Sequence, residues 1–293
     1  MTEPLRGSVW PEVPDHSVLS GRTAIISGAS RGIGAAVART LAGAGVAVVL
    51  LAKSGTGSPG RLPGVVDDVA AEINATGGRA LPHVGDLRSD DDVAAAIAAT
   101  VAEFGGIDIV VNNAASFDTT PTASISMKRY DLLNQINARG AFSLTRAALP
   151  HLQQSGHAHV LTISPPLTVE PRWLGPHTAY TVSKYAMSLM TLGLAAELAE
   201  VPIAANSLWP SVSVATEAIR TVLGEETATS RSRHPEVMAD AALEILSRSP
   251  RDYSGNLVTD VEVLRAAGVE DLSRYLVGGG EEDLLPSWFL PES

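Results

Sequence analysis

The stretch "TAIISGASRGIG", residues 23–34, places a short apolar run directly before three closely spaced glycines. The apolar run predicts a buried strand, and the alanine-rich sequence after the last glycine predicts a helix. Glycine permits a tight turn and lets the backbone approach a pyrophosphate, whose charge is stabilised by the amides of a helix N-terminus. The stretch therefore predicts a strand, a phosphate-binding turn and a helix. A glycine-rich turn without a ligand is the alternative.

Short β-branched runs alternate with longer alanine-rich amphipathic stretches along the rest of the chain, as in strand–helix units around a parallel sheet. Strands are expected at 23–27, 46–52, 79–84, 107–112, 158–164, 203–208 and 255–260. Helices are expected at about 32–43, 65–76, 90–104, 127–154, 176–199 and 235–247. These elements predict an α/β fold of the doubly wound Rossmann type, with a seven-stranded parallel sheet and helices on both faces.

One domain is expected over residues 20–262, with an N-terminal arm at 1–19 and a C-terminal tail at 263–293. The segment 216–234 and the glycine-rich part of the tail are the least regular. Near its end the tail brings Trp288 and Phe289 together. Because an aromatic cluster on a terminus tends to be covered, we expect this tail to dock on the domain or on a neighbouring subunit.

Composition excludes several classes of function. The 293 residues include no cysteine, which rules out disulfides and thiolate chemistry, and their net charge of −11 disfavours binding to nucleic acid or to an anionic membrane surface. No apolar run reaches the roughly 18 residues of a membrane span, so a cytoplasmic protein is expected. We interpret His151, His157 and His159 as surface residues and expect no metal site.

The predicted phosphate turn comprises Gly28, Ala29, Ser30, Arg31, Gly32, Ile33 and Gly34. An NAD site places a carboxylate about 20 residues after the first glycine, where it binds the ribose 2′-hydroxyl. The second strand ends instead in Lys53 and Ser54. Together with Arg31, Lys53 supplies a second cation for a 2′-phosphate, so NADP is favoured over NAD. The alternative is that Lys53 is a solvated loop residue.

"AYTVSK", residues 179–184, places Tyr180 and Lys184 four positions apart. Residues at this spacing share one face of a helix, so both can act on one substrate atom. A free phenol titrates near 10. A neighbouring ammonium stabilises the phenolate and is expected to lower the tyrosine pKa toward the working pH, which suits general acid–base catalysis.

Together these motifs resemble the short-chain dehydrogenases/reductases over about residues 20–260, through "SGASRGIG", "NNAA" (112–115), "NQINARGAF" and "YTVSK". The resemblance implies that Tyr180 transfers the hydroxyl proton and that Lys184 also binds the nicotinamide ribose. It further implies that Asn137 is a structural and proton-relay residue. By the same resemblance the other cofactor contacts are Asp86 at the adenine, Asn113 and Ala114 along the cofactor, and Val214 near the carboxamide.

A closer resemblance is to the hydroxysteroid dehydrogenase-like protein 2 group, through "GGIDIVVNNA", "ISPPLTVEPRW" and "HTAYTVSKYAMSL". It implies a dehydrogenase domain, here expected without the sterol-carrier domain that often follows it. The helix that carries Met187 and Met190 commonly packs against another subunit in this family. A homodimer or homotetramer is therefore expected.

One position departs from the family pattern. Most members carry a serine 13 residues before the tyrosine, but position 167 here is leucine. We expect Ser164, in "ISPP", to take this role. The alternatives are that the role is empty and the activity low, or that another donor such as His177 or Thr178 holds the substrate oxygen. The leading hypothesis is an NADP(H)-dependent oxidoreductase that acts on a secondary alcohol or ketone. A dinucleotide-sensing binding protein and a reductase of conjugated double bonds are the alternatives.

Overall fold

The computed structural model describes residues 14–57 and 63–290, and within them seven strands form one sheet in the order β3-β2-β1-β4-β5-β6-β7. All neighbouring strands pair in parallel. The strands are β1 (Thr23–Ser27), β2 (Ala47–Ala52), β3 (Arg79–Val84), β4 (Ile109–Asn112), β5 (Ala158–Ile163), β6 (Ile203–Trp209) and β7 (Leu257–Thr259). The chain order reverses between β1 and β4, which is where open sheets of this type bind ligands.

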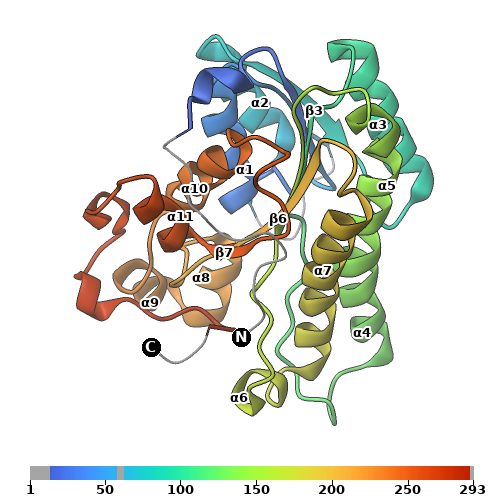
Figure 1. The fold of residues 1–293 in the computed structure, drawn as a ribbon. Helices are drawn as coiled ribbons and strands as arrows, with labels where there is room; N and C mark the ends of the chain where they lie inside the picture. Colours follow the sequence, from blue (N-terminus) through green and yellow to red (C-terminus); the bar gives the residue numbers. More distant parts are fainter. Residues whose placement is uncertain (1–13, 58–62, 291–293) are drawn as a thin grey trace.

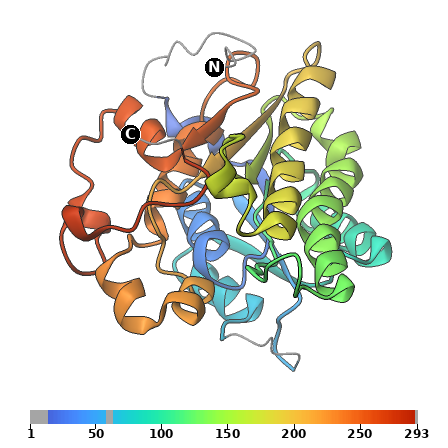
Figure 2. The same ribbon diagram turned by 90° about the horizontal axis from the view of Figure 1, so that it is seen from below.

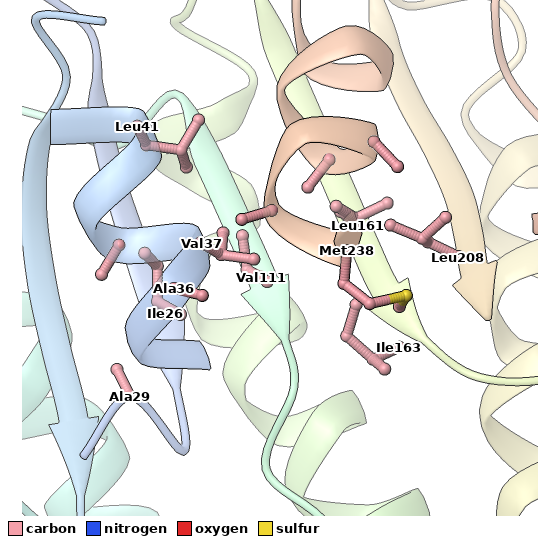
Figure 3. Packing of buried hydrophobic residues seen from close by; sticks show 14 of the residues in the cluster. Ile26, Ala29, Ala36, Val37, Leu41, Val111, Leu161, Ile163, Leu208 and Met238 are labelled. Carbon is pink, nitrogen blue, oxygen red and sulfur yellow. The ribbon is translucent and has the colours of Figure 1, made fainter. Parts of the chain in front are cut away.

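Helices cover both faces of the sheet (Figure 1). One layer contains α1 (Gly32–Gly43), α2 (Val66–Ala75) and α10 (Glu236–Leu246); the other contains α3 (Asp90–Phe104), α5 (Ala141–Leu152) and α7 (Thr178–Glu197). Successive strand residues point to opposite faces, so Ile26 packs in the first layer and Ile25 in the second. Figure 3 shows Val37 of α1 and Met238 of α10 in the same core cluster as Val111 of β4 and Leu161 of β5. The doubly wound fold is confirmed.

The expected helix at 127–154 is present as two α-helices separated by a π-helical turn. The first, α4 (Met127–Asn134), leads into the turn Gln135–Gly140, which leads into α5. Single π turns inside helices often mark functional sites. This turn carries Asn137, whose side chain is fully buried.

The segment 216–234, expected to be irregular, contains α8 (Glu217–Leu223) and α9 (Glu225–Ser230). The sequence analysis also missed α6 (Pro171–Leu174) and α11 (Asp260–Ala266). The expected domain boundary at 262 falls inside α11. These helices are too short for an apolar repeat to show, because four to seven residues span at most two helical turns.

The interpretation of the histidines as surface residues is wrong for two of the three. His157 and His159 are 7% and 1% exposed, because the chain enters the central strand β5 at this point. The His157 ring bonds the Leu246 carbonyl at 2.7 Å, and burial lowers the pKa of His159 to about 3. The described residues hold no group of three His, Cys, Asp or Glu side chains arranged to bind a metal.

Candidate active site

The glycine turn has the backbone geometry that its sequence predicts. Gly28 and Gly32 have φ values of 69° and 55°, a region that favours glycine. A Cβ on Gly34 would lie 2.4 Å from the Asn113 side-chain nitrogen and 2.6 Å from the Gly28 carbonyl oxygen. Asn113 itself donates to the carbonyls of Ser27 and Gly28, at 2.9 and 3.2 Å. The turn therefore packs closely against the end of β4.

A cavity of about 300 Å³ opens beside this turn at the carboxyl ends of β1, β2 and β4. Nine of the expected cofactor residues line it: Gly28, Ser30, Arg31, Gly32, Ile33, Lys53, Asp86, Asn113 and Ala114. The expected cofactor residues Ala29, Gly34, Lys184 and Val214 are buried and are not among its lining residues. Thr216 and Glu217, just beyond β6, line it without having been expected. The small glycine-rich wall and the cations fit a dinucleotide phosphate.

The two predicted cations, Arg31 and Lys53, line the same cavity but have different partners. Lys53 lies 3.3 Å from Asp86, which also pairs with Arg88. Burial tends to raise the pKa of Asp86, but hydrogen bonds from Arg88 and the charge of Lys53 outweigh it, so the pKa falls to about 2. The Arg31 guanidinium donates to the carbonyls of Pro63 and Gly64. Partial burial lowers its pKa, and Glu217 opposes that shift.

Tyr180 and Lys184 lie one turn apart on α7 and are 6% and 2% exposed. The Lys184 ammonium donates to the Ile163 carbonyl at 2.5 Å and lies 5.1 Å from the centre of the Trp209 ring. Burial lowers the pKa of Lys184 to about 7. Burial also raises the pKa of Tyr180 above its ordinary value. The expected lowering of the tyrosine pKa by the ammonium is therefore absent here, because desolvation dominates both groups.

Asn137 joins the π turn to both sides of the site. Its side-chain nitrogen donates to the Ser116 carbonyl at 3.0 Å and to the Ser183 hydroxyl at 2.9 Å, and its oxygen accepts from the Ser116 amide at 2.6 Å. Ser183 in turn donates to the Tyr180 carbonyl at 2.8 Å. Asn137 thus holds the loop after β4 against the turn of α7 that carries Tyr180.

Ser164 directly follows β5, and its side chain is directed toward the neighbouring strand β6. Its side chain is fully buried, and its hydroxyl pairs with that of Ser207 on β6 at 2.8 Å. Ser207 bonds the Ser164 carbonyl as well. His177 and Thr178 are engaged with main-chain carbonyls of Thr119 and Leu174. Within residues 14–57 and 63–290, the Tyr180 hydroxyl has no hydrogen-bond partner.

The surroundings of Tyr180 are aromatic, and sequence reasoning did not place them there. The rings of Phe117, Trp288 and Phe289 have centroids 4.9, 6.3 and 6.2 Å from that of Tyr180. The aromatic cluster of the tail was noted in the sequence, but nothing local indicated which surface receives it. Figure 2 shows the end of the tail crossing close to α6, where Trp173 lies.

The sequence profile of the family described as short chain dehydrogenase matches residues 22–226. The chain therefore belongs to this family, whose chemistry is that of oxidoreductases using a nicotinamide dinucleotide. The hydroxysteroid dehydrogenase-like protein 2 of Xenopus tropicalis is 43% identical over 96% of this chain. The chain spans 66% of the length of that relative.

Two solved structures extend the comparison. A short chain dehydrogenase from Mycobacterium thermoresistibile has a TM-score of 0.86 and 45% identity, covering 93% of this chain and 96% of its own. A metagenomic short-chain oxidoreductase in complex with NADP has a TM-score of 0.68 and 28% identity, covering 82% of this chain and 97% of its own.

In the described part of this chain, no helix is both long and apolar enough to cross a membrane.

Proposed function

We propose that this protein is an NADP(H)-dependent oxidoreductase that interconverts a secondary alcohol and a ketone. The observation that carries the proposal is the pairing of Tyr180 and Lys184 on one buried turn of α7, at the same edge of the sheet as the glycine-lined cavity. The NADP preference is supported by Arg31 and Lys53, which line that cavity, and by the absence of an acid at the end of β2.

The roles of the residues follow from their contacts. The nicotinamide supplies or accepts the hydride. A raised pKa keeps Tyr180 protonated at neutral pH, which is the state needed to protonate a ketone oxygen. Lys184 lies one helical turn from Tyr180, and its pKa of about 7 allows it to be charged or neutral near that pH. Asn137 bonds Ser183, in the helical turn between the two residues, and so holds that turn in place.

A dinucleotide-sensing protein of low activity is the second candidate. It is favoured by Ser164, whose hydroxyl is committed to Ser207 and leaves the usual serine role without its expected residue. Loss of one such donor to a substrate oxygen typically lowers the rate by two to three orders of magnitude.

The decisive experiment compares the wild type with Tyr180→Phe in an NADPH oxidation assay over a panel of ketones. An enzyme loses at least about 100-fold in kcat in the variant, because the proton donor is gone, while NADPH still binds. Lys53→Ala should selectively weaken NADPH relative to NADH, with Lys128→Ala as the matched control. Tight NADPH binding with no turnover of any ketone by the wild type would favour the sensor.

Three further expectations are also proposals. A homodimer or homotetramer is supported by the exposed apolar side chains of α5 and α7, among them Phe142 and Leu189. A cytoplasmic location and a small carbonyl or alcohol substrate remain predictions from the composition and from the family.

A further inference from the structure

The last described residues of the tail are fixed to the domain by main-chain bonds on both sides of the aromatic pair. Before the pair, the Ser287 amide donates to the Ser211 carbonyl at 3.0 Å. Within the pair, the indole nitrogen of Trp209 donates to the Trp288 carbonyl at 2.9 Å. After the pair, the indole nitrogen of Trp173 donates to the Leu290 carbonyl at 2.9 Å. The position of Trp288 beside Tyr180 is therefore set by the fold of the tail and not by a loose terminus.

Phe289 is the anchor of this arrangement. It is 1% exposed, and its ring contacts Tyr185 and Trp209, with centroids 5.4 and 6.0 Å away. Its φ of 68° is the only positive value among the non-glycine residues described. Non-glycine residues held in this backbone region are strained, and they cluster at functional sites. This turn brings two consecutive rings near Tyr180, with centroids 6.3 and 6.2 Å from that of the tyrosine.

Unlike Phe289, the side chain of Trp288 is partly exposed to solvent. Its indole stacks on His177 at 4.5 Å with an angle of 15° between the planes, and it lies edge-on to Tyr180. A partly exposed indole therefore lies beside the ring of Tyr180.

The charged groups next to these rings neutralise one another. Arg129, which bonds the Phe117 carbonyl, pairs with Asp118 at 2.7 Å. Arg172, which bonds the Leu290 carbonyl, pairs with Glu170 at 2.6 Å. Lys184 is the other charged group near Tyr180, and its ammonium is buried against the Ile163 carbonyl. The partly exposed surface beside Tyr180 is therefore aromatic with paired charges, and burying a carboxylate or phosphate of the substrate there would carry a desolvation cost.

We propose that Trp288 is the specificity-determining residue of this site, the wall against which an uncharged apolar substituent of the ketone packs. The inference rests on the proposed function for the identity of the reacting group, and it adds the chemical class of the substrate. Ketones with an aromatic or cyclic hydrocarbon substituent are favoured, and keto acids of similar size are disfavoured. Trp288 acts by contact with the substrate and takes no part in proton transfer.

The test uses three ketones, 4-phenyl-2-butanone, 2-butanone and 4-oxopentanoate, with NADPH and the full-length chain. In Trp288→Ala the ratio of kcat/KM for the phenyl ketone to that for 2-butanone should fall at least about 10-fold, as expected when one large apolar contact is lost. Trp288→Phe should restore most of the ratio. Glu282→Gln, an exposed change on the same tail, is the matched control. An unchanged ratio in Trp288→Ala would overturn the proposal.

Binding separates this inference from the proposed function. Tyr180→Phe with bound NADPH should still bind 4-phenyl-2-butanone, measured by isothermal titration calorimetry, and adding Trp288→Ala should weaken that binding at least about 10-fold. If the wild type turns over no ketone but this binding difference is found, the oxidoreductase proposal fails and the role of Trp288 stands. If turnover occurs and 4-oxopentanoate is used as well as the phenyl ketone, the role of Trp288 fails alone.

Discussion

Among single residues, Lys184 places an ammonium in a buried position of the site, where desolvation disfavours its charge. It lies buried against a carbonyl and an aromatic ring, and its pKa falls from 10.5 to about 7 because of burial. Between these values the unfolded chain holds a proton that the folded chain has released, so stability rises with pH. Below pH 7 the lysine is protonated in both states and contributes no slope.

Replacing Lys184 by methionine removes this dependence. Without cofactor, the unfolding free energy of the wild type relative to Lys184→Met should rise between pH 7 and 9.5, with a slope of up to about 1.4 kcal/mol per pH unit. Urea titrations at four pH values measure it. The control is Lys128→Met, at an exposed position at the start of α4. The difference in unfolding free energy between the wild type and this variant should not change with pH. Parallel curves for wild type and Lys184→Met would show that the lysine keeps its proton in the fold.

At the scale of elements, the turn between β1 and α1 depends on the absence of one side chain. A Cβ on Gly34 would meet the Gly28 carbonyl and Asn113, both held in place by the end of β4. Gly34→Ala should therefore destabilise the protein by about 1–3 kcal/mol and weaken NADPH binding at least about 10-fold. Urea unfolding and a fluorescence titration with NADPH measure the two effects.

Gly43, the last residue of α1, is the matched control, since a Cβ there meets nothing within 4 Å. Gly43→Ala should leave NADPH binding unchanged and stabilise the helix by about 0.5–1 kcal/mol. Equal behaviour of the two variants would mean that the close packing of the turn has no role in holding the cofactor.

In the whole molecule, α5 and α7 lie side by side on one flank (Figure 1). Apolar side chains on both helices are exposed there. Leu189 of α7 is 58% exposed and Phe142 of α5 is 53% exposed, whereas Met187, expected on the same apolar face, is fully buried in the core. Clustered exposed apolar residues mark interaction surfaces, and most soluble oligomers are symmetric.

We expect Leu189→Glu to lower the molar mass in solution, because a carboxylate buried in a symmetric interface would lie close to its own copy. Sedimentation velocity measures the mass. Val84→Glu, equally exposed on β3 at one edge of the sheet, is the control and should leave it unchanged. A wild type that sediments as a monomer would refute the expected oligomer directly.

Local sequence patterns were enough to predict the sheet, the long helices and the glycine turn. Each of these elements is predicted by a local pattern, because β-branched runs, apolar periodicity and glycine spacing can be recognised within about 20 residues. The strands at 23–27 and 79–84 match residue for residue. The pairing of Tyr180 with Lys184 on one helical face follows from the same local geometry.

The surroundings of that pair could not be predicted, because they depend on how distant parts of the chain pack together. The contact between Trp288 and Tyr180 joins positions more than 100 residues apart, and no local pattern records such a contact. The commitment of Ser164 to Ser207 depends on the register between β5 and β6. The pKa shifts of Tyr180 and Lys184 arise from burial, which depends on every element that packs over α7 and so cannot be read from their spacing.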